Sequence, residues 1–316
     1  MATTIFEATY SASQQITATF DMVWALDAGL WNLRQAATQY LTEHPEANTK
    51  EAKDALVKGL YVHGLNLKRI ATELSWEYEE QYIAELLLIN AIAIFDTWVD
   101  EFVDASILGK SNNQRKEIKK AVKAGDFSLL DSALAQEAPS SLAGCFHFAA
   151  KKQDTYIDNL RLVYKYFKSC RNCCAHGNRK FSIIAETNYN AIKTFTKDDC
   201  GIKEFPKIEV TKENDPLKLI LRGVVGFYDI LIRIMNHYDI VASDKIAVEA
   251  ELLRRWSSLP YVALPVELKK RIDTLRYHKK RNESIRFHIG SVNMCRPYVA
   301  KTDDIYNFLT ANNITV

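Results

Sequence analysis

Apolar residues recur every three or four positions along most of this chain, which is the spacing of one face of an α-helix. Residues 11–42 carry such a stripe, which ends before His44-Pro45, and a second pattern runs from Thr49 to about Leu74. The segment from about Tyr82 to Asp104 is apolar nearly all round its first half. A helix of that kind is covered on all sides, so we expect it to be central in its domain.

The rest of the chain also favours helices, with one exception. Helices are predicted over 110–135 (two short ones), from about Thr155 to His176, over 216–241 after a cap-like Asp215-Pro216, over 244–257 and from about Val266. The exception is a pair of segments, 179–184 and 206–211, in which apolar and polar residues alternate as in short strands.

These elements predict an all-α protein. We expect a helical bundle with a minor β-hairpin-like insertion at about 179–212. The bundle comprises residues 1–241, divided into N-terminal helices (1–78) and a core (80–241), and residues 242–316 form a helical C-terminal appendage. Only 11 Gly and 7 Pro in 316 residues favour long helices with few turns.

Composition narrows the function classes. A net charge of +2 gives no global field that would drive nucleic-acid binding, so any such binding must come from local patches. The N-terminus lacks a basic region followed by an apolar core, and Glu85, Asn90 and Asp96 interrupt the most apolar segment, so neither a secretory signal nor a membrane span is predicted. Six Cys are too few for a disulfide scaffold, which favours a cytoplasmic protein with free thiols.

The stretch KYFKSCRNCCAHGNRKF, residues 165–181, concentrates the chemistry of the chain. The helix leading into it has an apolar stripe formed by Leu160, Val163, Phe167, Cys170 and Cys174. Gly177 is a typical helix cap, so the helix should end at His176. Arg171 falls on the edge of the buried stripe, where a guanidinium is costly unless it is paired or binds an anion.

Three interpretations of this stretch compete. Cys170-x-x-Cys173 has zinc-ligand spacing, but one helix supplies only two of four ligands, and Cys145 and His147 make a weak second pair. A redox Cys-x-x-Cys normally opens a helix, whereas this one lies near a helix end, where Cys more often packs as a small apolar residue. The third interpretation makes Arg171 and His176 the active pair.

Arg171-Asn172-x-x-x-His176 at the end of a long helix resembles the motif of the HEPN superfamily (higher eukaryotes and prokaryotes nucleotide-binding domain). The resemblance extends to an all-helical core over about residues 80–240. It implies a metal-independent endoribonuclease without cofactors, of a toxin or anti-phage defence type. The expected products carry a 2′,3′-cyclic phosphate and a 5′-hydroxyl.

The chemistry suits these residues. RNA supplies its own nucleophile, the 2′-hydroxyl, so the protein needs a group that titrates near neutrality, His176, and a fixed cation for the phosphate, Arg171. Asn172 would orient His176 or hold the phosphate. The resemblance further implies a homodimer with the apolar motif helix as its seam, and control by an antitoxin or sensor partner. Asp96 and Asp100 are expected to pair with Arg171 or position it.

Other cations are candidates for RNA binding. Lys168, Arg179 and Lys180 lie in or beside the motif, and Lys279, Lys280 and Arg281 lie in the basic run 267–288; a solvated charged surface explains either group equally simply. The alternative function is that of a non-catalytic helical interaction or RNA-binding protein, with a structural zinc at Cys170 and Cys173.

Overall fold

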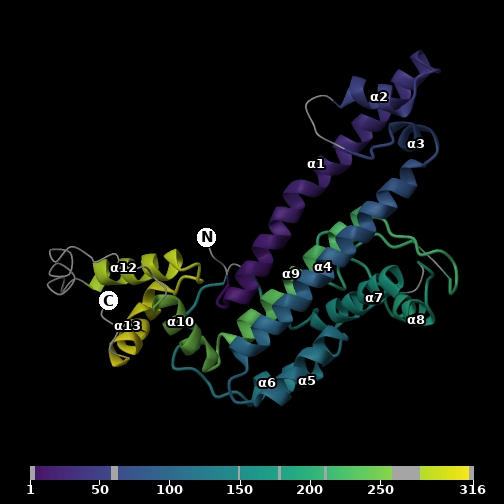
Figure 1. Ribbon diagram of the computed structural model, residues 1–316. Helices are drawn as coiled ribbons and strands as arrows, with labels where there is room; N and C mark the ends of the chain where they lie inside the picture. Colours follow the sequence, from purple (N-terminus) through teal and green to yellow (C-terminus); the bar gives the residue numbers. More distant parts are fainter. Residues whose placement is uncertain are drawn as a thin grey trace.

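The computed structural model describes residues 4–57, 63–148, 150–176, 179–209, 212–257 and 278–312, and the side chains of 278–281 lie outside the described part. Figure 1 shows helices throughout. Their bounds are α1 Glu7–Glu43, α2 Thr49–Leu56, α3 Leu67–Thr72, α4 Trp76–Ser106, α5 Asn112–Lys123, α6 Ser128–Gln136, α7 Ile157–His176, α8 Ile183–Ile192, α9 Leu221–Ala242, α10 Ala247–Ser257, α12 His278–Ser291, the 3₁₀ turn η1 Val299–Lys301 and α13 Thr302–Ala311. The all-α class is confirmed.

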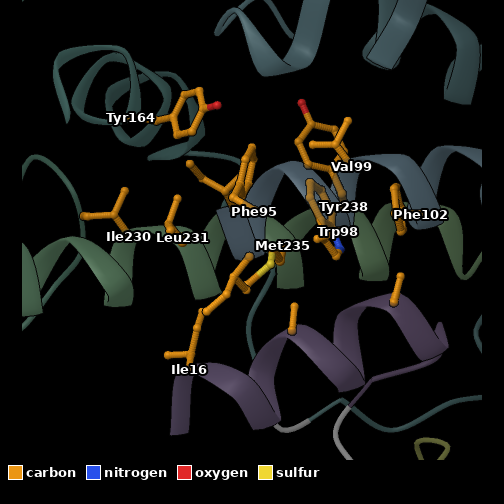
Figure 2. Close-up of a cluster of buried hydrophobic side chains, with 14 of the residues drawn as sticks. Ile16, Phe95, Trp98, Val99, Phe102, Tyr164, Ile230, Leu231, Met235 and Tyr238 are labelled. Atoms are coloured by element: carbon orange, nitrogen blue, oxygen red, sulfur yellow. The ribbon is translucent and has the colours of Figure 1, made fainter. Parts of the chain in front are cut away.

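Helix α4 is the central element of the fold, as its all-round apolar sequence predicts. Its Phe95, Trp98 and Phe102 lie between α1, α9 and α7 (Figure 2). The Trp98 ring stacks on Phe102 at 4.9 Å, and its indole N–H donates to Thr9 Oγ1 at 3.0 Å. By length and composition α4 could cross a membrane, but 56% of its most apolar window is buried inside the protein, as in the core helix of a soluble protein.

Helices α1 and α4 run antiparallel and extend together beyond the body as an arm (Figure 1). The predicted 49–74 helical pattern forms two short helices, α2 and α3, at the tip of this arm. A separate small core of Ala37, Ala52 and Leu67 holds the tip together. Arg34 adds hydrogen bonds to the carbonyl oxygens of Ile70 and Leu74, both at 2.6 Å.

The start of α1 is stabilised from a distant part of the chain. Phe6 provides no side-chain cap; instead the carboxylate of Asp239 on α9 accepts hydrogen bonds from the backbone N–H groups of Ile5 and Phe6, at 2.6 and 3.0 Å. Burial raises the pKa of Asp239 to about 7, because its effect is larger than the opposite effect of these two hydrogen bonds, which lower the pKa. These hydrogen bonds attach the start of α1 to α9 in the core, although more than 230 residues separate the two in sequence.

The predicted β-hairpin-like insertion is wrong. Ile183 and Ile184 begin helix α8, because the Ser182 hydroxyl caps it by accepting from the Ala185 N–H at 3.2 Å. Residues 206–209 form no regular element, and 210 and 211 lie outside the described residues. Within the described part of this segment, the nearest feature to a strand is the isolated bridge between Lys180 and Pro216.

That bridge also explains a second error. Asp215-Pro216 does not start a helix, because the backbone around Pro216 pairs with residues 179–181: the Leu217 N–H donates to the Arg179 carbonyl at 2.8 Å. Helix α9 begins five residues later, at Leu221. The helix-start signal is local, and pairing with a distant segment overrides it.

The appendage joins the body without a break in packing at residue 241. Its Ile285, Ile289, Met294 and Leu309 belong to the same cluster of buried residues as α4. Arg255 on α10 is buried and donates to the carbonyl oxygens of Val292 and Asn293, at 3.0 and 2.9 Å. The predicted loop 259–265 and the helix start near Val266 lie outside the described residues.

One buried titratable group makes the stability of this core depend on pH. His237 on α9 is buried, and its Nδ1 accepts a hydrogen bond from the Gln153 N–H at 3.3 Å, which requires that nitrogen to be unprotonated. Burial lowers the pKa of His237 from 6.5 to about 4. Below pH 6.5 the unfolded chain therefore binds a proton here that the folded chain does not bind until about pH 4.

We therefore expect His237 to lower the free energy of unfolding by on the order of 3 kcal/mol as pH falls through this window. His237→Gln keeps an acceptor and cannot titrate, so the difference in stability between the variant and the wild type should shift in favour of the variant by that amount. Urea denaturation at several pH values measures it, with exposed His44→Gln as the control. An unchanged difference would contradict the assignment.

Candidate functional site at the end of α7

The motif helix α7 ends at His176, as predicted. The apolar stripe of α7 packs within the protein, since Leu160, Val163, Phe167 and Cys170 are buried. The Phe167 ring stacks on Phe227 of α9 at 4.4 Å. Because this stripe already packs against α4, α8 and α9, the stripe itself is not free to form a dimer seam. The same packing fixes the rotation of α7 and so the direction of each motif side chain.

Arg171 lies at the edge of the packed surface. Two ion pairs join this part of the chain to α4: Lys168 on α7 pairs with Asp96 at 3.1 Å, and Arg179, just beyond the end of α7, pairs with Glu85 at 3.0 Å. Arg171 follows Lys168 by three residues and shares its side of the helix, so it lies along α4 between these pairs. The charges of Asp96 and Arg171 both act on the buried Tyr164, whose pKa is raised chiefly by burial.

The guanidinium of Arg171 keeps unused hydrogen-bonding capacity. Its Nε is buried without a hydrogen-bond partner, and its Nη1 lies 3.4 Å from Asn172 Oδ1. A buried guanidinium nitrogen without a partner is costly, and an anion would satisfy it. The same feature occurs at Arg115 and Arg161, so it marks unused hydrogen-bonding capacity and does not by itself identify a ligand.

His176 and Asn172 are both exposed. They are four residues apart and so lie on the same side of α7. Five residues separate Arg171 from His176, which turns the second side chain by about 140° around the helix relative to the first. Arg171 and His176 therefore converge on one phosphate only at the open end of the helix, or with the help of groups from another chain.

The predicted supporting acids pair with lysines and not with Arg171. Asp96 pairs with Lys168, and Asp100 pairs with Lys123 on α5 at 2.6 Å. The expectation that either pairs with Arg171 is not met among the described contacts.

Two of the predicted RNA-binding cations are engaged within the protein. Lys168 is mostly buried against Asp96, and Arg179 pairs with Glu85; Lys180 is exposed. The side chains of Lys279, Lys280 and Arg281 lie outside the described part of the structure.

Sequence reasoning missed the partner of Arg179. Glu85 on α4 is buried, and the Arg179 guanidinium also lies 5.0 Å from the centroid of the Tyr82 ring and donates to the Tyr78 hydroxyl. Arg179 has a left-handed backbone with φ of 60°, and its N–H donates to the Cys173 carbonyl at 3.2 Å. These contacts hold the segment that follows the motif against α4, and we call them the clamp. The sequence did carry a signal for it, because Glu85 is an acid inside an apolar run and would need a cation as its partner.

The cysteines behave as packing residues. Cys170 and Cys173 are buried, and the Cys173 thiol lies 3.5 Å from the Ser182 hydroxyl. Burial raises the pKa of Cys170 strongly and that of Cys174 to about 12, which disfavours the thiolate that zinc binding or redox chemistry needs. Over the described ranges no group of three or more His, Cys, Asp or Glu could hold a metal.

No family model, curated protein or solved structure matches this chain. The resemblance to the HEPN motif therefore depends on Arg171, Asn172 and His176 and on the all-helical core.

The clamp can be tested by its energetics. Arg179→Met leaves the buried Glu85 carboxylate without its charge partner, and should lower the free energy of unfolding by about 1–3 kcal/mol, less than for a fully buried pair because Arg179 is partly exposed. Adding Glu85→Gln should restore most of that loss. Chemical denaturation of both single variants and the double variant gives the coupling. Additive losses would mean that the ion pair is not a clamp.

Proposed function

We propose that this protein is a metal-independent endoribonuclease that acts in the cytoplasm as a toxin or anti-phage defence effector. One observation carries the proposal: Arg171 has a buried Nε without a partner, five positions before an exposed His176 that ends the same helix. An anion-binding group and a titratable group at an open helix end are the two parts that RNA cleavage needs.

The proposed reaction uses the RNA's own 2′-hydroxyl. That oxygen attacks the adjacent phosphorus, the bond from phosphorus to the 5′-oxygen breaks, and a 2′,3′-cyclic phosphate and a 5′-hydroxyl result. His176 transfers the proton, from the 2′-hydroxyl or to the leaving 5′-oxygen. Arg171 binds the phosphate oxygens as negative charge grows on them, and Asn172 holds the phosphate or orients His176.

The proposal includes two kinds of partner. A second copy of the chain would supply a second Arg171–His176 set, which is supported by the wide angle between these side chains within one helix. Control by an antitoxin or a sensor follows from the cost of an unregulated ribonuclease to the cell.

The first test is toxicity. Expression of the wild type in a bacterial host should stop growth, and His176→Ala should relieve it, because the proton-transfer group is lost while the exposed position leaves the fold intact. Colony counts and growth curves after induction measure this, with His44→Ala as the matched exposed control. Equal growth of wild type and His176→Ala, with equal protein levels, would count against the enzyme.

The second test separates the charge of Arg171 from its geometry. Arg171→Lys keeps a positive charge but loses the planar fork, so turnover on single-stranded RNA should fall by on the order of 10²–10³. Wild-type cleavage should persist in EDTA and yield 2′,3′-cyclic phosphate ends. Loss of activity in EDTA, or 3′-hydroxyl products, would show metal-dependent chemistry and overturn the proposal.

A further inference from the structure

A pocket separate from the motif opens between α1, α9 and residues 202–209, here called the connecting segment. Its volume is about 310 Å³. The residues that line it are Trp24 on α1, Arg222, Val225 and Gly226 on α9, and Glu204, Phe205 and Pro206 on the connecting segment. Helix α7 supplies none of these residues, so the pocket is not part of the candidate site at the end of that helix.

Two glycines of α9 let the connecting segment lie against the helix and form a wall of the pocket. A Cβ atom at Gly223 would lie 1.9 Å from the carbonyl oxygen of Lys207, and one at Gly226 would lie 3.3 Å from the Cα of Pro206. No residue with a side chain fits at the first of these distances, so the close approach depends on glycine at position 223. Pro206 is buried by this packing, and Phe205 packs partly against the core.

Trp24 is the unusual residue of this pocket. Among the five tryptophans of the chain, all of which the structure describes, it alone has no aromatic ring packed against it. Trp31 and Trp76 pack on each other at 4.9 Å. Trp98 and Trp256 each have an aromatic or imidazole neighbour. Trp24 is 47% exposed, so a large flat ring at the wall of the pocket is available for stacking on a planar ligand.

The size and the walls of the pocket suit two fused rings. A cavity of roughly 150 Å³ is enough for benzene, so about 310 Å³ leaves room for a second ring. Trp24 and Phe205 provide aromatic walls, and Pro206 and Val225 provide apolar ones. Aromatic side chains stack on nucleic-acid bases because every base has a π-face. A purine base therefore matches both the volume and the lining.

A charged pair at the exposed edge of the pocket decides which purine fits. Arg222 Nη2 lies 2.7 Å from Glu204 Oε2, and both side chains are more than half exposed. Within the described structure this is the one hydrogen bond of either side chain, so Glu204 Oε1 and Arg222 Nε and Nη1 remain available to a ligand. An exposed ion pair contributes little stability, so the pair can also rearrange around a ligand at small cost.

The available groups match the edge of guanine. Its N1–H and N2–H₂ groups are donors, which a carboxylate accepts, and its O6 and N7 atoms are acceptors, to which arginine donates. Adenine presents an acceptor at N1 and a donor at N6, which are the opposite of what Glu204 and Arg222 require. The pair therefore favours guanine over adenine, and the two-ring volume favours it over a pyrimidine.

We propose that this pocket binds a guanine base, with the ring stacked on Trp24, the N1 and N2 groups on Glu204 and the O6 side on Arg222. The same base occurs in free nucleosides and nucleotides and in RNA, and the recognition is common to these sources. The proposal does not depend on the proposed ribonuclease, because no residue of the motif lines the pocket.

Isothermal titration calorimetry with guanosine tests this pocket on the full chain. The wild type should bind guanosine with saturation, and should bind adenosine and cytidine at least about tenfold more weakly. Trp24→Ala should weaken the binding of guanosine about tenfold, because the stacking surface is lost. Trp31→Ala, at a comparably exposed tryptophan of the same helix, should bind guanosine as the wild type does. Circular dichroism confirms that each variant is folded.

Glu204→Gln adds a readout that a loss of structure would not imitate. The glutamine amide offers one donor and one acceptor, which suits the N1 and N6 edge of adenine. The ratio of the affinities for guanosine and adenosine should therefore fall by about tenfold or more. Lys203→Gln, at the neighbouring exposed position outside the pocket, should keep the ratio of the wild type.

The source of the base is distinguished with His176→Ala, which prevents the proposed cleavage. Tighter binding of a short single-stranded RNA that contains one guanosine than of guanosine monophosphate would identify RNA as the source, and the reverse order a free nucleotide. Three outcomes would overturn the proposal: no saturable binding of guanosine at millimolar concentration, equal affinity for adenosine, or unchanged affinity in Trp24→Ala. Binding of tryptophan amide in place of guanosine would also overturn it, because the pocket would then take an aromatic side chain of a protein.

Discussion

The packing of α4 fixes the position of the candidate site. Phe95, Trp98 and Phe102 must be covered on several sides, and α1, α7 and α9 each supply part of that cover. Once Phe167 stacks on Phe227 and Lys168 pairs with Asp96, α7 cannot rotate about its axis without losing both contacts. Arg171 is then held at the border of α4, and Asn172 and His176 are held in solvent. The rigidity of the motif comes from the core and not from contacts within the motif.

The sequence was sufficient for features that depend on neighbours in the helix. The central place of α4, the end of α7 at His176 and the unusual position of Arg171 all follow from spacing of three and four, and the structure agrees. It was insufficient wherever a distant residue decides. Asp239 caps a helix more than 230 residues away, and Pro216 pairs with Lys180 in place of opening a helix. In both cases a backbone group found its partner through the fold, which periodicity cannot reveal. The failed strand at 179–184 has a local cause, because Ser182 caps helix α8 three residues before Ala185, and alternation alone does not register a cap.

The partners of the cations around the motif were also decided by residues distant in sequence. Lys168 and Arg179 looked available for phosphate because their sequence neighbours are polar, yet each pairs with an acid of α4. An acid buried in an apolar helix must find a cation, and the end of α7 supplies them. Of the cations in the motif region that the structure describes, Arg171 has a buried nitrogen without a partner, and Lys180 is exposed. The motif region of one chain therefore presents a modest positive surface, in keeping with the small net charge of the protein.

Substrate binding would then need either charge from elsewhere or a second copy, and the arm bears on that choice. The inner half of α4 is buried, whereas Leu86 and Ile89 on its outer half and Met22 on α1 are exposed. The cost of that exposure falls only if the surface is covered in the working state. The angle of about 140° between Arg171 and His176 within one helix would be no obstacle if each of them acted with its counterpart from a second copy.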